Sequence, residues 1–223
     1  MPEAVIVATA RSPIGRAFKG SLTSIRPDDL TTQIVSAALA KVPQLDPADI
    51  DDLMLGCGLP GGEQGFNMAR VVAVLLGHDR LPGTTVNRYC SSSLQTTRMA
   101  YHAIKAGEGD VFISGGVECV SRGVKGTSDT WPDTTNPLFA PAQARTAATA
   151  AADSASWHDP RSDSEVPDVY IAMGQTAENV AGEHQISRTD QDAFAYRSQR
   201  RCKAAQDRGF FDKEIVKVCV KKG

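Results

Sequence analysis

Cys90 is the residue whose type and position in this sequence best suit covalent chemistry. It lies in the stretch V-N-R-Y-C-S-S-S-L at 86–94, between a β-branched segment at 84–86 and a predicted helix at 92–106. In an open α/β sheet, ligands bind where a strand ends and a helix begins. The free N–H groups at a helix start favour a thiolate, and thiols there have depressed pKa values. Cys90 is therefore a candidate nucleophile for acyl transfer; the alternative is a buried thiol beside serines that merely cap the helix.

A nucleophilic thiol needs a base within hydrogen-bond reach, and the sequence contains four histidines that must be considered. His102 lies on the same predicted helix as Cys90, about 18 Å further along its axis at a rise of about 1.5 Å per residue. His78 follows a helix end and His184 ends a helix, whereas His158 lies in a loop and stays open as a partner. The pattern therefore singles out none of the four as the base.

The elements that must position Cys90 alternate between strand and helix over residues 1–122. The sequence predicts strands at 4–8, 53–55, 84–86 and 110–114, and helices at 28–39, 67–76 and 92–106. This order predicts an α/β fold with a mostly parallel sheet covered on both faces. The run at 4–8 is expected to be a buried strand, because Glu3 stands where a secretory signal has positive charge.

Residues 123–223 differ in character, and we place a domain boundary between 122 and 123. Glycine, proline and polar residues dominate 123–141, which shows little periodicity. The later patterns predict a helix or ordered loop at 145–155, helices at 173–183 and 188–208, and a final strand at 215–220. Residues 183–223 carry ten basic and six acidic side chains, a net charge of +4. This charge either meets an anionic ligand or forms a solvated helix face.

Composition and charge exclude several classes of protein. The 24 Lys and Arg residues against 26 Asp and Glu give a net charge of −2, which provides no basic field for nucleic acid or anionic membranes. No apolar run approaches the roughly 18 residues that a membrane span needs. The five cysteines are odd in number and form no C-x-x-C pair, so we expect a reducing, cytoplasmic location and no metal site.

Five motifs, in order, resemble those of the thiolases, the acyl-CoA C-acyltransferase family. They are V-I-V-A-T-A-R-S-P-I-G-R at 5–16, G-F-N-M-A-R at 65–70, N-R-Y-C-S-S-S-L at 87–94, G-E-G-D-V-F-I-S-G-G-V-E-C-V-S-R at 107–122 and M-G-Q-T-A-E-N at 173–179. Any one of these motifs would be weak evidence, but the set is highly specific and covers nearly the whole chain.

The resemblance implies both a fold and residue roles. Thiolases have two similar β-α-β-α-β-α-β-β halves in a five-layered fold, with a loop domain inserted in the first half. Residues 1–122 would then be the amino-terminal core half, and 123–223 an incomplete loop domain with coenzyme A binding and oligomer contacts. Cys90 corresponds to the nucleophile that takes up the acyl group, and Met173 to a wall of the acyl and pantetheine site.

The resemblance also implies substrates and partners. The substrates would be acyl-CoA or 3-ketoacyl-CoA together with free CoA, without a metal or another cofactor. The subunits would form a homodimer or homotetramer, with no nucleic acid or membrane as partner. Neither the length of the acyl chain nor the reaction direction follows from these residues.

The sequence departs from the family pattern near Cys90 and near Met173, and it lacks three of the family's motifs. Ser93 stands where the family usually has glycine, so its side chain is expected to narrow the approach to Cys90, unless it is simply another helix-start serine. Ala172 stands where much of the family has histidine. The N-E-A-F, G-H-P and C-x-G motifs, which carry the activating histidine and the second cysteine, do not occur.

Three hypotheses therefore stay open. The chain is the amino-terminal part of a thiolase whose remainder lies elsewhere, including in a separate carboxyl-terminal chain. Alternatively, it is a non-catalytic CoA-binding or assembly protein. The third hypothesis is a ketoacyl-synthase-like condensing enzyme, because C-S-S-S also resembles that relative's nucleophile turn. The Asn87-Arg88-Tyr89 prefix and the M-G-Q-T-A-E-N motif argue against the third.

Overall fold

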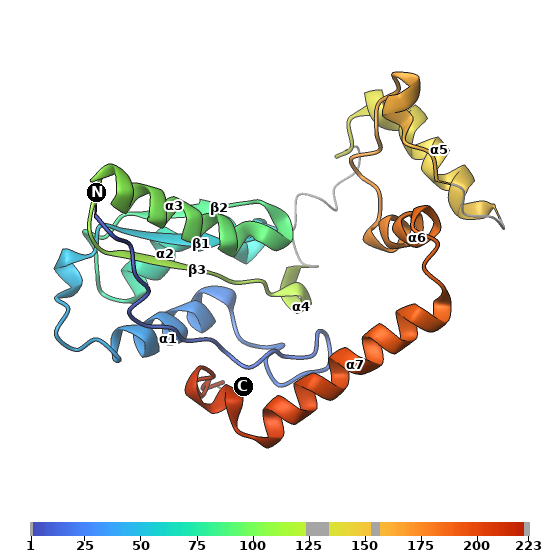
Figure 1. The fold of residues 1–223 in the computed structure, drawn as a ribbon. Helices are drawn as coiled ribbons and strands as arrows, with labels where there is room; N and C mark the ends of the chain where they lie inside the picture. The colour runs from blue at the N-terminus through green and yellow to red at the C-terminus, as the bar shows by residue number, and fades with distance from the viewer. Residues whose placement is uncertain (1, 124–133, 153–156, 221–223) are drawn as a thin grey trace. The chain divides into compact units, whose positions relative to one another are not determined.

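The computed structural model describes residues 2–123, 134–152 and 157–220. Its residues fall into two compact units, which are described separately (Figure 1). The first unit combines Met1–Trp131 with Phe211–Gly223, and the second comprises Pro132–Phe210. The carboxyl-terminal residues thus return to the unit in which the chain begins.

The first unit is built on a parallel sheet of three strands among the described residues. These strands are β1 (Asp52–Gly56), β2 (Gly83–Val86) and β3 (Phe112–Gly116), in the spatial order β2-β1-β3. Leu53 of β1 is in register with Gly83 on one side and Ile113 on the other. Because all three strands are parallel, their carboxyl ends share one edge of the sheet, which confirms the α/β class expected from the alternating pattern.

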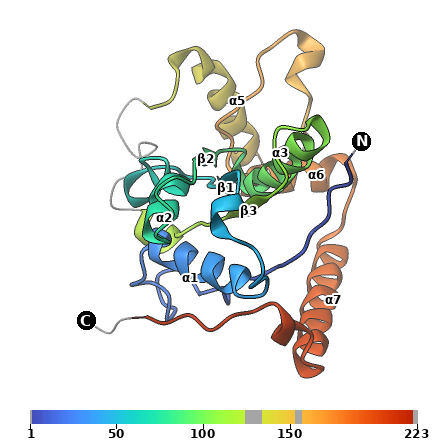
Figure 2. The ribbon, with the colours of Figure 1, turned by 90° about the vertical axis from the view of Figure 1, so that its left-hand side faces the viewer.

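Helices cover both faces of this sheet (Figures 1 and 2). α3 (Ser92–Ala106) lies on one face, and α1 (Pro27–Leu39) and α2 (Met68–Leu75) lie on the other. The core lies between β1 and the α1–α2 face; it includes Val35, Leu53, Leu55, Met68 and Val72. Alternate β1 side chains enter this core, which is why a short apolar strand suffices to anchor the sheet.

The first unit also contains short helical segments. They are η1 (Pro47–Asp49), η2 (Gly62–Gln64), η3 (Tyr89–Ser91), α4 (Val120–Gly123) and η7 (Phe210–Lys213, at the junction with the second unit). The segments η2, η3 and α4 each follow a strand, so they lie near the carboxyl edge of the sheet.

The second unit contains helices and no strand among its described residues. Its elements are η5 (Pro137–Phe139), α5 (Ala140–Ala151), η6 (Pro160–Asp163), α6 (Met173–Glu183) and α7 (Arg188–Asp207). The hydroxyl of Ser187 accepts a 3.1 Å hydrogen bond from the backbone N–H of Asp190 and thereby caps the start of α7. The predicted helix at 173–183 is confirmed to the residue.

Two predicted strands are wrong. Val5, Ile6 and Val7 do not form a buried strand; they are 69, 78 and 73% exposed. The expected strand at 215–220 is reduced to a single parallel bridge between Arg11 and Ile215. An apolar, β-branched run has a high strand propensity, but a strand also needs a neighbouring strand with which its backbone groups can pair. Composition alone therefore predicted a strand in both segments where the structure has none.

Candidate active site

Cys90 lies at the carboxyl edge of the sheet, four residues beyond the end of β2 and two before the start of α3. It is the middle residue of η3 and is exposed to solvent. The alternative in which Cys90 is a buried thiol is therefore wrong. An exposed thiol where a strand passes into a helix is accessible to a substrate, and its backbone lies near the positive end of the helix dipole.

Side chains on both sides of Cys90 hold its turn. The hydroxyl of Ser92 accepts a 2.8 Å hydrogen bond from the N–H of Arg88 and donates a 2.6 Å bond to the carbonyl of Tyr89. The carboxamide oxygen of Asn87 accepts a 2.8 Å bond from the N–H of Tyr89. Tyr89 has a φ of 45°, in the left-handed region that costs energy for a bulky residue. The buried Ser92 thus stabilises a strained turn, beyond any role in capping α3.

The start of α3 packs directly on the ends of the central strands. A Cβ on Gly56 would lie 2.5 Å from the backbone nitrogen of Ser93, so this close approach requires glycine. The hydroxyl of Ser93 lies against Gly116 at the end of β3. The side chain that departs from the family pattern is thus in contact with the sheet edge, next to the turn of Cys90.

The carboxylate of Glu118, which the sequence pattern did not single out, connects the segment after β3 with the segment after β1. Glu118 accepts a 2.7 Å hydrogen bond from the N–H of Gly58 and another of 2.7 Å from the carboxamide of Gln64. The thiol of Cys57 lies 3.7 Å from the same carboxylate. Burial raises the pKa of Cys57 to about 11, and the charge of Glu118 acts in the same direction. The one available signal was the acid within G-G-V-E-C, directly after a strand.

Within the described residues, no histidine makes a hydrogen bond to Cys90. His102 lies on α3 as predicted, and its ring is tilted by 55° against that of Tyr101, with the ring centroids 5.6 Å apart. His78 lies between α2 and β2, at the opposite edge of the sheet from Cys90. The first unit, as far as it is described, therefore presents a candidate nucleophile without an adjacent imidazole base.

The second unit contains Met173 and a pocket. Met173 is the first residue of α6, follows Ala172, and is 75% exposed. Its carbonyl accepts a 2.7 Å hydrogen bond from the hydroxyl of Thr176. The structure therefore leaves this methionine side chain available for contacts, rather than placing it in a core.

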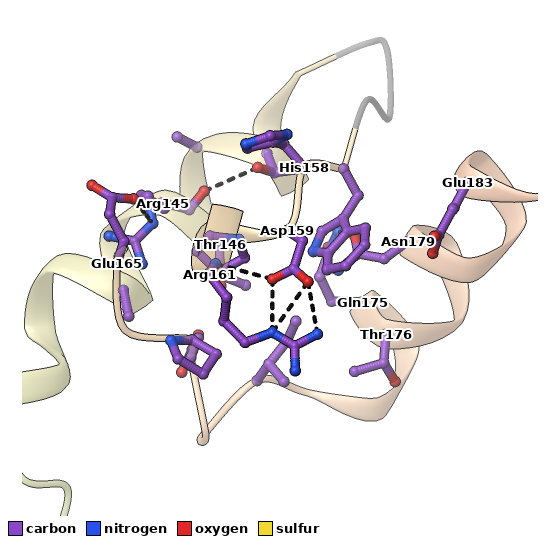
Figure 3. A pocket seen from close by; sticks show the side chains of 18 of the residues that line it. Arg145, Thr146, His158, Asp159, Arg161, Glu165, Gln175, Thr176, Asn179 and Glu183 are labelled. Carbon is purple, nitrogen blue, oxygen red and sulfur yellow. Dashed lines mark hydrogen bonds and ion pairs between the residues drawn. The ribbon is translucent and has the colours of Figure 1, made fainter. Parts of the chain in front are cut away.

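A pocket of about 580 Å³ lies between α5, η6 and α6 of the second unit (Figure 3). Figure 3 shows the guanidinium of Arg161 facing the carboxylate of Asp159, with contacts of 2.7 to 3.1 Å. This hydrogen-bonded arginine lowers the pKa of Asp159. His158 similarly pairs with Asp163 at 2.9 Å. The charges of Arg161 and Asp159 are thus paired within the pocket wall, which weakens their electric field toward a ligand.

The described ranges contain neither a metal site nor a membrane-spanning helix. No group of three His, Cys, Asp or Glu side chains in them is arranged to hold a metal ion. None of the helices described there is both long enough and apolar enough to cross a membrane.

Comparison with known proteins identifies the family. The chain is 40% identical over 219 residues to a 3-ketoacyl-CoA thiolase of Bacillus subtilis, covering 98% of this chain and 49% of the relative. It is 40% identical over 230 residues to a beta-ketoadipyl-CoA thiolase of Acinetobacter baylyi, covering 99% of this chain and 52% of the relative. The chain thus spans about half the length of the curated relatives it matches.

A solved structure and a family model agree with these relatives. The crystal structure of the Bacillus anthracis acetyl-CoA acetyltransferase matches with a TM-score of 0.73 and 28% identity, covering 98% of this chain and 51% of that one. Residues 4–223 match the family described as "Thiolase, N-terminal domain". The chain therefore belongs to the thiolase family.

Proposed function

We propose that this chain carries the nucleophile of an acyl-CoA C-acyltransferase, and that Cys90 accepts the acyl group as a thioester. The observation that carries the proposal is the exposed Cys90 at the carboxyl edge of the parallel sheet, directly before α3. Family membership supports acyl-CoA chemistry and favours it over a ketoacyl-synthase-like reaction.

The proposed reaction is an acyl exchange between two thiols. The sulfur of Cys90 attacks the thioester carbon of an acyl-CoA, or the C3 keto carbon of a 3-ketoacyl-CoA, and a new C–S bond forms. In the exchange with acyl-CoA, the C–S bond to CoA breaks and the CoA thiolate takes up the proton lost by Cys90. With 3-ketoacyl-CoA, a C–C bond breaks instead, and the acetyl-CoA carbanion takes the proton. The thiol of free CoA then attacks the acyl carbon, the C–S bond to Cys90 breaks, and the sulfur of Cys90 takes up the proton lost by CoA. N–H groups at the start of α3 favour the attacking thiolate.

The remaining parts of the site follow from the thiolase resemblance. The histidine that activates the cysteine would come from the family's carboxyl-terminal half, in the same longer protein or in a separate chain. Met173 would line the acyl and pantetheine site, which agrees with its exposure. The loop domain at 123–223 would bind CoA and make oligomer contacts, and the assembly would be a cytoplasmic homodimer or homotetramer without a metal or another cofactor.

Transfer of an acetyl group to Cys90 tests the proposal. We expect the purified chain, incubated with acetyl-CoA, to gain an acetyl group on the peptide that contains Cys90, as measured by mass spectrometry. Cys90→Ala should abolish this labelling. Cys202→Ala is the matched control, because Cys202 is also exposed but lies within α7 rather than before a helix.

The outcome separates enzyme from binding protein. Acetylation that spares Cys90, or that labels Cys90 and Cys202 equally, would contradict the nucleophile role and favour a chain that only binds CoA. Adding a carboxyl-terminal thiolase half that carries the G-H-P motif should accelerate the labelling of Cys90, because a general base typically contributes about 100-fold or more.

A further inference from the structure

We propose that Glu118 is a positioning residue for Cys90, acting through the segment that follows β1. This proposal rests on the proposed function of Cys90, but a separate measurement tests each of the two. It rests on two observations: the side chain of Glu118, after β3, is hydrogen-bonded to the segment after β1, and Gly58 of that segment lies beside the turn that presents Cys90.

Backbone pairing of β1 stops just short of this turn. The N–H of Cys57 donates to the carbonyl of Val86 at 3.0 Å, and the carbonyl of Gly56 accepts from the N–H of Val117 at 3.0 Å. One residue further along both segments, the N–H of Gly58 donates to the side chain of Glu118 and not to a backbone carbonyl. Glu118 thus continues the connection between β1 and β3 beyond the last ladder bond.

Gln64 makes this bridge reciprocal. Its carboxamide nitrogen donates to Glu118 at 2.7 Å and to the carbonyl of Leu59 at 2.9 Å, and its oxygen accepts a 2.6 Å bond from the N–H of Cys119. Gln64 is 4% exposed. Loss of the carboxylate would therefore take a partner from a buried carboxamide, which is costly. The bridge is in this way held in one geometry.

Gly58 connects the bridge to the nucleophile turn. A Cβ built on Gly58 would lie 2.8 Å from a carboxylate oxygen of Glu118 and 3.4 Å from the backbone Cα and carbonyl carbon of Tyr89. That carbonyl carbon is bonded to the nitrogen of Cys90. Tyr89 has the left-handed φ of 45°, a conformation that persists where surrounding structure enforces it. The N–H that Glu118 accepts thus belongs to a residue that lies beside Tyr89, the strained residue directly before Cys90.

Position and charge predict opposite effects of removing the carboxylate. If Glu118 positions the turn, Glu118→Gln leaves Cys90 less well placed at the start of α3, and its thiolate is less favoured. If Glu118 acted only by its negative charge, the same change would favour the thiolate and speed its reactions. The sign of the change in reactivity of Cys90 thus discriminates the two.

The test is the pH dependence of alkylation by iodoacetamide, followed at Cys90 by peptide mass spectrometry, with the exposed Cys202 as the reference in each sample. We expect Glu118→Gln to slow Cys90 at pH 7 about fivefold and to raise the midpoint of its pH profile. Gly58→Ala keeps the charge but displaces the carboxylate, so it should slow Cys90 in the same direction. Glu108→Gln, an exposed acid beyond the end of α3, should change neither.

Three outcomes overturn the proposal. The first is faster alkylation of Cys90 in Glu118→Gln. The second is an unchanged midpoint with a lowered melting temperature, which would show that the bridge stabilises the fold alone. The third, decisive if Glu118→Gln does not fold, is an unchanged Cys90 profile in Gly58→Ala.

Acetylation of Cys90 by acetyl-CoA separates this proposal from the proposed function. Acetylation with unchanged alkylation profiles would overturn the positioning role alone. Shifted profiles without acetylation of Cys90 would overturn the proposed function alone.

Discussion

At the scale of single residues, the surroundings of each cysteine decide its chemistry. Cys90 is exposed before a helix, whereas Cys57 is buried at the end of β1 beside the carboxylate of Glu118. Burial, followed by that negative charge, raises the pKa of Cys57 to about 11. Cys57 is therefore a protonated thiol at neutral pH and a poor candidate for a nucleophile.

The raised pKa of Cys57 predicts a loss of stability at alkaline pH. The thiol has a higher pKa in the folded chain than in the unfolded chain. Its contribution to the free energy of unfolding is therefore complete below the unfolded pKa of 9.0 and is lost as the pH rises toward 11. We expect the free energy of unfolding by urea to fall between about pH 8 and 10.5 by about 2 kcal/mol more in the wild-type chain than in Cys57→Ala.

A matched variant isolates this effect from other groups that titrate in the same range. Cys202→Ala removes an exposed thiol and should keep the full pH dependence of the wild-type chain. Parallel stability curves for the wild-type chain and Cys57→Ala would contradict a raised pKa at Cys57.

At the scale of elements, the approach of α3 to β1 sets where the turn of Cys90 lies. Gly56 ends β1 beneath the first residues of α3, and a Cβ there would meet backbone atoms of Ser92 and Ser93 at 2.5 Å. Backbone atoms cannot rotate away as the end of a side chain can. The glycine at this position is thus a requirement of packing between the strand and the helix.

Gly56→Ala should therefore destabilise the fold, by about 2 to 3 kcal/mol as for other overpacked sites. Gly174→Ala is the control: no atom lies within 4 Å of its Cβ position, other than its own helix, and alanine favours the helical state by about 0.5 kcal/mol or more. Urea unfolding measures both. Equal midpoints for Gly56→Ala and the wild-type chain would show that α3 can move off the sheet at little cost.

At the scale of the whole molecule, burial is distributed unequally between the two units. The hydrophobic core of Val35, Leu53, Leu55, Met68 and Val72 belongs entirely to the first unit. Among the described residues of the second unit, the buried ones are Ala142, Asn179 and Ala205. Apolar burial is the main source of stability, so the first unit is expected to be the more stable.

Hydrogen exchange measured by mass spectrometry tests this inequality. We expect amides of β1 and α2 to exchange about tenfold or more slowly than those in the middle of α7, which contributes one buried residue. Addition of CoA at saturating concentration should slow exchange in the second unit if that unit binds it. Similar protection of β1 and α7 without any ligand would contradict the unequal stability.

The sequence by itself determined the family, the parallel α/β class and the place of Cys90 between β2 and α3. It did so because helical periodicity, glycine at helix ends and the motif order are local signals. The bounds of α3 and α6 were accordingly predicted to the residue. Local propensity failed at 4–8 and 215–220, where a strand depends on a pairing partner that no local pattern specifies.

Only the tertiary structure showed what surrounds Cys90. Glu118 lies 60 residues from Gly58 and 54 from Gln64 along the chain, so neither hydrogen bond leaves a trace in local sequence. The exposure of Cys90, the burial of Cys57 and the contact of Ser93 with Gly116 likewise depend on which strands become neighbours. Pairing of distant strands in the order β2-β1-β3 brings these groups to one edge of the sheet, and that pairing is a property of the folded chain.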